Sequence, residues 1–443
     1  MKNRKNSSLD TRDTGLARKR PLPWELPGAH WIGREELRLV SQVVRARSPF
    51  RFYGPDLQHM TDRLERAFAG RLGRKHALGV NSATSGLYIA LAALGVGAGD
   101  EVLLPGFLWV SCLSAIVRLG AIPRLVDIDD TFCMSPEDLQ RKIGCRSKAV
   151  LFIHMSGAPG HIDAVAKICK RAGVGLIEDC AQANGASLRG RSAGSFGDIA
   201  VFSFQLNKNM SSGEGGMIVC DRQNIYKRCF AMHDLGYARN AAGRLDPSDV
   251  CYQFWGAGSR MSELTAAMAL AQFGKLNRIV HAMRKAKWRI RRQLAGIPGL
   301  EFRNILDPSG DSSPFLITIF RDAQTCRAFA AGLQEEGLRG PTGSLACVAM
   351  EQFGLHWYFN NQSLTNRRSL GPDGAPWSHP ANAFAAKYNY ARGALPVCDD
   401  LAARSVLLTI ASCLTPSDCK DIVTAYRKVA ARVLKSPRVI AKP

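Results

Sequence analysis

The chain has 443 residues and a formal net charge of +22. A length above roughly 300 residues exceeds what one simple core holds, so we expect a large domain and a smaller one. No apolar run reaches the roughly 18–20 residues that cross a bilayer, and residues 1–20 lack the apolar region of a secretory signal. These features exclude a membrane span and a signal peptide, and we expect a cytoplasmic protein whose residues 1–22 form a disordered basic tail.

The positive charge is spread along the chain, with its densest cluster at residues 284–292, where six of nine residues are basic. This cluster is either a solvated helix face or a contact for an anionic substrate. The 13 cysteines form no CxxC pair and show no zinc-ligand spacing with histidine. Cys112 and Cys220 lie in apolar segments, so we expect reduced thiols, small core residues and no metal site.

Short apolar runs alternate with helical patterns between about residues 75 and 220. Most runs are continuously apolar, which is typical of strands buried on both faces of a mostly parallel sheet. The alternation predicts a layered α/β domain. The predicted helices include residues 84–94 and 160–172, and the predicted strands are residues 76–80, 101–104, 124–128, 149–153, 174–178, 198–203 and 216–220.

A long helical pattern spans about residues 261–294 and ends before Pro298 and Gly299. We therefore predict a large domain over residues 23–296 and a smaller α+β domain over residues 297–443. The smaller domain should contain a strand at 315–320, a helix at 323–336, long loops over 340–400 and a last helix. That helix should begin with Thr415 as N-cap and Pro416 as its first residue.

Two stretches carry groups suited to an anionic ligand. Ser82, Ala83 and Thr84 follow a predicted strand and begin a helix, whose unpaired N–H groups suit a phosphate. The same residues also fit plain helix caps. Asp179 follows the carboxyl end of another predicted strand, where open α/β sheets bind ligands. Once buried, this carboxylate either needs a cationic partner, such as a protonated pyridine nitrogen, or serves as a helix cap.

Lys208 lies in a short loop between two predicted buried strands, followed by Gly213, Gly215 and Gly216. A partly desolvated lysine has a lowered pKa and can form a Schiff base, whereas an ordinary loop lysine is simply exposed. The context of this loop favours the first interpretation.

Seven blocks of sequence resemble the DegT–DnrJ–StrS family of sugar aminotransferases, which have the fold of aspartate aminotransferase. Together with GAHWIGREELRLV, which looks like the family's N-terminal helix entry, they keep the family's order and spacing over more than half of the chain. The blocks are NSATSGLYIALAALGVGAGDEVLLP, GAIPRLVDID, HMSGAPGHIDAV, IEDCAQANGA, GSFGDIAVFSF, NKNMSSGEGGM and RMSELTAAMALAQ. The resemblance implies a three-layer fold, pyridoxal 5′-phosphate as cofactor, and a homodimer with shared active sites.

The resemblance also implies roles for individual residues. Lys208 matches the Schiff-base lysine, and Asp179 matches the carboxylate that pairs with the pyridine nitrogen. Trp109 matches the aromatic residue that stacks on the cofactor ring, and Gln182 matches the residue near the ring's phenolic oxygen. The implied phosphate-binding residues are Ser82, Ala83, Thr84 and Ser203.

The resemblance implies transfer of an amino group from glutamate or glutamine to a nucleotide-linked keto-sugar or a keto-cyclitol. Such products serve amino-sugar, antibiotic or surface-glycan biosynthesis. The alternatives are a sugar dehydratase of the same fold, which would carry histidine where this chain has Lys208, and a cofactor-binding regulator without turnover. The high charge motivates the regulator, although no nucleic-acid-binding motif is present.

One position departs from the family. Gly258 stands where the family has an asparagine that reaches the phosphate of the neighbouring subunit, so Ser259 or Arg260 is a candidate replacement. Three histidines have open roles. His154 and His233 are either structural or catalytic, and His356, with Trp357 and Tyr358, either lines the substrate pocket or packs in a loop.

Overall fold

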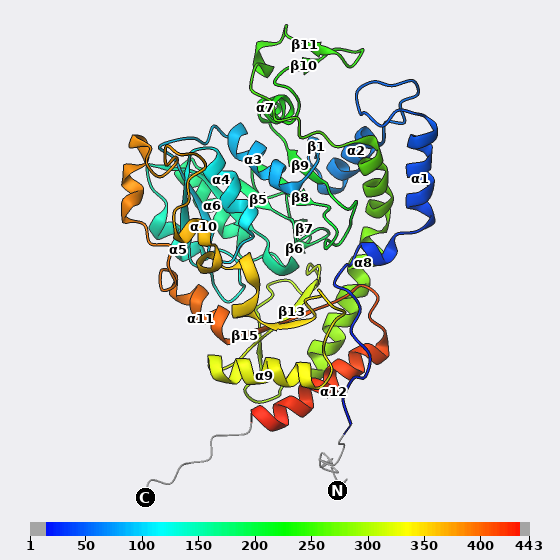
Figure 1. Cartoon of the computed structure of the whole chain (residues 1–443), viewed down its shortest axis with the longest axis vertical. Helices are drawn as coiled ribbons and strands as arrows, with labels where there is room; N and C mark the ends of the chain where they lie inside the picture. The colour runs from blue at the N-terminus through cyan, green and yellow to red at the C-terminus, as the bar shows by residue number, and fades with distance from the viewer. Residues whose placement is uncertain (1–14, 435–443) are drawn as a thin grey trace, which may run out of the picture.

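The computed structural model describes residues 15–434. Its centre is a seven-stranded sheet with the order β1-β9-β8-β5-β4-β2-β3 (Figure 1). Only β9 runs antiparallel to its neighbours. The predicted mostly parallel seven-stranded sheet is therefore confirmed. Its strands are β1 (His76–Val80), β2 (Glu101–Pro105), β3 (Ile122–Val126), β4 (Ser147–Ile153), β5 (Gly175–Asp179), β8 (Ile199–Ser203) and β9 (Gly216–Cys220).

Side chains alternate between two apolar cores, one on each face of this sheet. In β8, Ile199 and Val201 enter one core, while Ala200 and Phe202 enter the other. The period of two in a strand explains this division, and continuous apolar runs result because both faces are covered. Helices α3 (Ala83–Ala93), α4 (Val110–Arg118), α5 (Pro136–Lys142) and α6 (Ile162–Ala172) supply the first core, and α1 (Arg34–Arg45), α2 (Met60–Leu72) and α8 (Glu263–Leu294) supply the second.

The third strand begins two residues before its predicted start, at Ile122 instead of residue 124. It ends at Val126 because Asp127 leaves the ladder. The Asp127 carboxylate accepts hydrogen bonds from the backbone N–H groups of Val397 and Cys398, at 3.0 and 2.8 Å. A distant segment therefore sets the end of this strand.

The C-terminal region contains a four-stranded antiparallel sheet with the order β12-β13-β15-β14. Its strands are β12 (Glu301–Phe302), β13 (Phe315–Ile319), β14 (Cys347–Ala349) and β15 (Ser405–Thr409), and its helices are α9 (Ala323–Glu335), α11 (Pro396–Arg404) and α12 (Pro416–Val433). Thr415 caps α12 as expected, in a reciprocal pair with Asp418. The strand β15, at the centre of this sheet, was not predicted.

Residues 340–400 contain little regular structure, as expected, yet they bury large side chains. Trp357 and Tyr358 are fully buried and join the core that α3 to α6 cover. The Tyr390 hydroxyl donates to the Pro123 carbonyl at 2.8 Å. This segment therefore packs on the large sheet. Its helical pieces are η4 (Met350–Gln352), η5 (Gly354–His356), η6 (Tyr358–Asn360), α10 (Gln362–Thr365) and η7 (Pro380–Lys387).

Residues 15–22, which were expected in a disordered tail, lie instead against the C-terminal region, while residues 1–14 fall outside the described residues. Arg18 is buried and pairs with Asp418 at 2.7 Å and Asp421 at 3.1 Å. Leu22 is buried, and its N–H donates to the Arg339 carbonyl at 2.7 Å. The ordered chain thus begins before the predicted border.

An arm after α7 (Gln223–His233) extends from the top of the molecule in Figure 1. It contains the hairpin of β10 (Ala238–Arg239) and β11 (Leu245–Asp246), followed by η3 (Val250–Tyr252). A second small hairpin, β6 (Ser187–Leu188) and β7 (Arg191–Ser192), belongs to the segment that connects β5 to β8 in the sequence. The remaining short helices are η1 (Ala29–Trp31) and η2 (Met155–Gly157). Within residues 15–434, no helix has the length and apolar character needed to span a membrane.

Candidate active site

Asp179 is the last residue of β5 and is buried at the carboxyl edge of the sheet. Its Oδ1 accepts the Ala181 N–H at 2.9 Å, and its Oδ2 accepts the thiol of Cys112 at 3.3 Å. Burial raises the pKa of the Asp179 carboxyl, while these hydrogen bonds and the charge of Lys208 act in the opposite direction. A buried carboxylate of this kind is stabilised by a cation brought next to it.

Lys208 lies in the loop between β8 and β9, half-buried. Its N–H donates to the Gln205 carbonyl, and its own carbonyl accepts the Gly28 N–H, both at 3.0 Å. Burial lowers the pKa of the amine, partly opposed by the charges of Asp179 and Glu214. The Nζ has no hydrogen bond or ion pair within the described part of the chain, so the amine is free to react with a carbonyl group.

Trp109 immediately precedes α4, and its side chain is 43% exposed. One neighbour of its ring is His356, with ring centroids 4.8 Å apart and planes inclined at 44°. The Leu108 N–H donates to the His356 carbonyl at 2.8 Å, so the two loops are joined beside the ring. The exposed indole can therefore receive a flat ligand.

The start of α3 combines a cap with free N–H groups. The Ser82 Oγ accepts the Ser85 N–H at 3.1 Å, which confirms the cap. The backbone N–H groups of Ala83 and Thr84 have no acceptor among residues 15–434 and remain available to an anion. A Cβ added to Gly216 would lie 2.8 Å from the Ala83 nitrogen, so glycine leaves room beside this helix start.

Two further predicted residues have one polar group already engaged. The Gln182 Oε1 accepts the Ser156 N–H at 2.9 Å, which leaves the amide NH₂ to donate elsewhere. Ser203 is buried at the end of β8, and its Oγ accepts the Gln205 N–H at 3.3 Å. The Ser203 hydroxyl proton therefore remains available as a donor.

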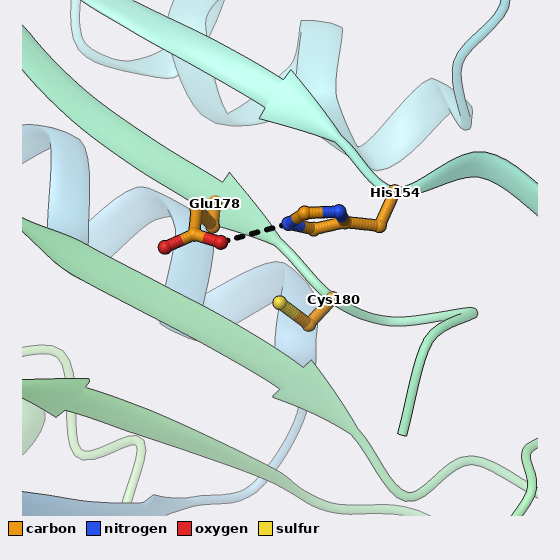
Figure 2. A group of neighbouring side chains, drawn as sticks. All are labelled: His154, Glu178 and Cys180. Atoms are coloured by element: carbon orange, nitrogen blue, oxygen red, sulfur yellow. Dashed lines mark hydrogen bonds and ion pairs between the residues drawn. The ribbon is translucent and has the colours of Figure 1, made fainter. Parts of the chain in front are cut away.

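Figure 2 shows His154, Glu178 and Cys180, whose ligand atoms lie within 4.8 Å of one another. The His154 Nε2 donates to Glu178 at 2.8 Å. The same carboxylate also accepts the N–H groups of Gly194, Phe196 and Gly197. Burial alone would raise the pKa of Glu178, but the hydrogen bonds outweigh it and leave the pKa lowered.

These bonds decide the role of the cluster in Figure 2. The Glu178 carboxylate is fully engaged without a metal ion. Burial raises the pKa of the Cys180 thiol well above its ordinary value. His154 thus joins the ends of β4 and β5 next to Asp179 through its Nε2, while its buried Nδ1 has no hydrogen-bond partner among residues 15–434.

The residues after the arm have partners within the chain. Arg260 pairs with the buried Asp234 at 2.6 Å. Ser259 is buried, and its carbonyl accepts the Asn81 N–H at 2.9 Å. Gly258 has a φ of 64° and donates its N–H to the Asp234 carbonyl. Asp234 also pairs with Arg239 at 2.5 Å, so this one carboxylate is shared by two guanidinium groups and does not neutralise both. Ser259 and Arg260 therefore both remain candidates for a contact with a neighbouring phosphate.

The assembled groups fit pyridoxal phosphate. A buried carboxylate suits a pyridinium nitrogen, an unpaired amine suits the aldehyde, and free N–H groups suit the phosphate. A model of the DegT/DnrJ/EryC1/StrS aminotransferase family matches residues 32–343. The chain belongs to this family. It is accordingly a pyridoxal-phosphate-dependent aminotransferase, and the expected three-layer fold of such transferases is confirmed.

Solved structures show the same fold over nearly the whole chain. The aminotransferase TlmJ from Streptoalloteichus hindustanus is 27% identical, with a TM-score of 0.73 over 91% of this chain and 98% of that one. A 3-amino-5-hydroxybenzoic acid synthase is 24% identical, with a TM-score of 0.74 over 95% of this chain and 100% of that one. A putative sugar aminotransferase from Streptococcus pneumoniae, in its PMP form, is 20% identical, with a TM-score of 0.73 over 94% of this chain and 99% of that one.

Sequence reasoning missed the part played by Cys112. It expected a small core residue, and the thiol is indeed buried, but it also donates to Asp179. Cys112 belongs to α4 and Asp179 to β5, and their contact arises only when this helix packs over the sheet. The sequence around either residue therefore contains no pattern that predicts this hydrogen bond.

Proposed function

We propose that this aminotransferase moves an amino group from glutamate or glutamine to a nucleotide-linked keto-sugar or a keto-cyclitol. Its product would enter amino-sugar, antibiotic or surface-glycan biosynthesis. The observation that carries the proposal is the relation between Lys208 and Asp179. A lysine with a lowered pKa, whose amine has no partner in the part of the chain that the structure describes, lies within electrostatic range of a buried carboxylate at the carboxyl edge of one sheet.

Each residue has a defined task in this proposal. Bound pyridoxal phosphate supplies a ring that withdraws electrons from the reacting carbon. Asp179 keeps the pyridine nitrogen protonated, and Trp109 fixes the ring plane by stacking. Lys208 would hold the cofactor through its aldehyde, and the amine, when free, would act as the base and acid that moves a proton at the reacting carbon. The Gln182 amide donates to the phenolic oxygen, and the phosphate is held by Ser82, Ala83, Thr84 and Ser203.

His356 supports a substrate rich in hydroxyl groups. Its Nδ1 lies 3.1 Å from the Phe353 carbonyl, which can only accept, so Nδ1 carries the proton. Burial lowers the pKa of the imidazole to about 4, so the ring is neutral at pH 7. Its Nε2 is therefore a hydrogen-bond acceptor beside Trp109, suited to a hydroxyl group of a sugar or cyclitol.

Lys208 also bears on the alternatives. A dehydratase of this fold carries histidine at this position, so lysine favours transamination. A regulator without turnover would bind cofactor but leave the amino donor unchanged. An enzyme would convert the amino donor and aminate a ketone, whereas a regulator would do neither, so these two reactions distinguish the proposal from this alternative.

The test uses the purified holoprotein. Borohydride reduction should leave a pyridoxyl group on Lys208, detected by peptide mass spectrometry, and Lys208→Ala should carry none. Glutamate or glutamine should bleach the cofactor band, and one member of a panel of keto-sugars and inososes should restore it. Label on another lysine would contradict the site assignment, and a band unchanged by every donor would contradict transamination.

A further inference from the structure

A cavity of about 420 Å³ lies between the second half of α8 and the loop that follows β12. None of its lining residues belongs to the candidate active site. Five of them belong to α8 and lie on one face of the helix, three, four, seven and eleven residues after the first. The lining consists of His281, Arg284, Lys285, Trp288, Arg292, Pro308 and Ser309.

The cations of this cavity have no acidic partners. Among residues 15–434, no carboxylate lies within 4.0 Å of the charged groups of Arg284, Lys285 or Arg292. By contrast, Lys287, on another face of α8, is buried and pairs with Asp311 at 2.6 Å. Within the basic cluster at residues 284–292, Lys287 thus forms a structural ion pair, whereas Arg284, Lys285 and Arg292 line the cavity without an acidic partner among residues 15–434.

Two contacts shape this group. The Arg284 Nε donates to the Asp311 carbonyl at 2.8 Å, which fixes that guanidinium beside the loop. The nearby carboxylate of Asp307 accepts the N–H of Ser309 in its own loop and the N–H of Arg189 in the hairpin of β6 and β7. It stays charged, and it offsets at most one of the three cations. The cavity thus retains a net positive charge, which attracts an anion.

The wall itself is largely apolar. Trp288 and Pro308 contribute rings, and the basic side chains contribute their aliphatic stems. The Arg291 guanidinium covers the Trp288 ring at 4.8 Å and steadies it. The volume falls within the roughly 300–1,000 Å³ of small-molecule pockets. A ligand that fills this cavity combines a flat apolar ring with an anionic group.

We propose that this cavity is a binding site for a nucleoside diphosphate, separate from the site of amino transfer. The base packs against Trp288 and Pro308, and the diphosphate pairs with Arg284, Lys285 and Arg292. A lone phosphate would leave the apolar wall unused, and a nucleoside alone would leave the cations unpaired. The proposal does not depend on the identity of the keto substrate.

Calorimetry with ADP tests this site, with adenosine and inorganic pyrophosphate as partial ligands. ADP should bind the holoprotein more tightly than either partial ligand. Lys285→Glu combined with Arg292→Glu should weaken ADP binding at least about tenfold, or about 1.4 kcal/mol. The exposed pair Lys170→Glu and Arg171→Glu on α6 is the matched charge control and should change it little. A nucleotide-linked substrate would also bring a diphosphate to the active site, so the double variant, whose two changes line only this cavity, separates the two sites.

The ring contact has its own test. Trp288→Phe should keep most of the affinity and Trp288→Leu should lose it, with thermal unfolding used to check that both variants fold. Absence of ADP binding, equal binding of pyrophosphate, or indifference to the double charge reversal would each overturn the proposal. Heparin binding that is lost in the double variant, without ADP binding, would assign the surface to a polymeric anion and would also overturn it.

Discussion

The hydrogen bond from Cys112 to Asp179 restrains the carboxylate on which the proposed chemistry depends. The Cys112 Sγ lies 3.3 Å from Oδ2, and burial raises the pKa of the thiol well above its ordinary value, so it stays protonated and donates. A neutral donor orients the carboxylate without neutralising it. Cys112 is therefore a positioning residue for Asp179.

Replacement of Cys112 by Val should keep the buried volume but remove this donor. One lost hydrogen bond of about 1 kcal/mol predicts a turnover about fivefold lower, with KM for the amino donor nearly unchanged. Cys112→Ser should restore most of the turnover. Cys220→Val is the control, because Cys220 is buried on β9 away from Asp179. Steady-state kinetics measure all three variants, and equal turnover in Cys112→Val and the wild type would refute the role.

His233 is a buried group whose neutral form is fully hydrogen-bonded. Its Nδ1 donates to the Phe230 carbonyl at 2.7 Å, and its Nε2 accepts from Arg51 at 3.4 Å. Burial, and then the charge of Arg51, lower the pKa of the imidazole from 6.5 to about 3. A proton on Nε2 would oppose the guanidinium directly. The role is therefore structural.

This pKa shift predicts a loss of stability in acid. The unfolded chain binds a proton at His233 below about pH 6.5, whereas the folded chain does not bind it until about pH 3. The free energy of unfolding should therefore fall as the pH drops between these values. His233→Gln, which keeps a donor and an acceptor but cannot titrate, should show a shallower decline. Thermal unfolding across this range measures the difference, and parallel curves would contradict the assignment.

Among the elements, the segment of residues 15–22 shows how the N-terminus stabilises the C-terminal region. Arg18 reaches the first two turns of α12, where Asp418 and Asp421 accept hydrogen bonds from its guanidinium. Its N–H also donates to the Glu336 carbonyl at 3.0 Å, just beyond α9. The segment thus joins two helices that are distant from it in sequence.

Arg18→Ala should lower the free energy of unfolding by about 1–3 kcal/mol, because it leaves two partly buried carboxylates without their cation. Arg20→Ala is the matched control, since Arg20 is exposed and two residues away. Urea unfolding compares the two variants. A smaller loss for Arg18→Ala than for Arg20→Ala would show that the segment contributes no stability.

The same segment shows what sequence patterns can and cannot predict. The strands of the large sheet were predictable because burial on both faces gives continuous apolar runs. The positions of Asp179, at the end of a strand, and of Lys208, in a loop between two buried strands, were predictable as well. The packing of Arg18 was not, because its partners lie 400 residues further along the chain. Strand β15 was missed because it follows α11 directly, without the turn residues that normally mark a strand.

At the scale of the whole molecule, the arm between α7 and α8 projects from a strongly basic protein (Figure 1). Trp255 is 96% exposed and Val250 is 72% exposed, with Leu235 and Tyr237 nearby in sequence. Large apolar side chains gathered on a projecting element are typical of an interaction site. We propose that this arm packs against a second copy of the chain, in the homodimer with shared active sites that the family resemblance implies.

Trp255→Glu should therefore weaken the dimer, because it places a charge in an apolar interface and removes a large anchor residue. Leu370→Glu is the control, since Leu370 is 65% exposed on a different loop. Sedimentation equilibrium measures both variants across salt concentrations. The charge of +22 on each copy opposes association, so salt should strengthen the wild-type dimer. A monomeric wild type at every salt concentration, or a Trp255→Glu dimer as tight as the wild type, would exclude the arm as the interface.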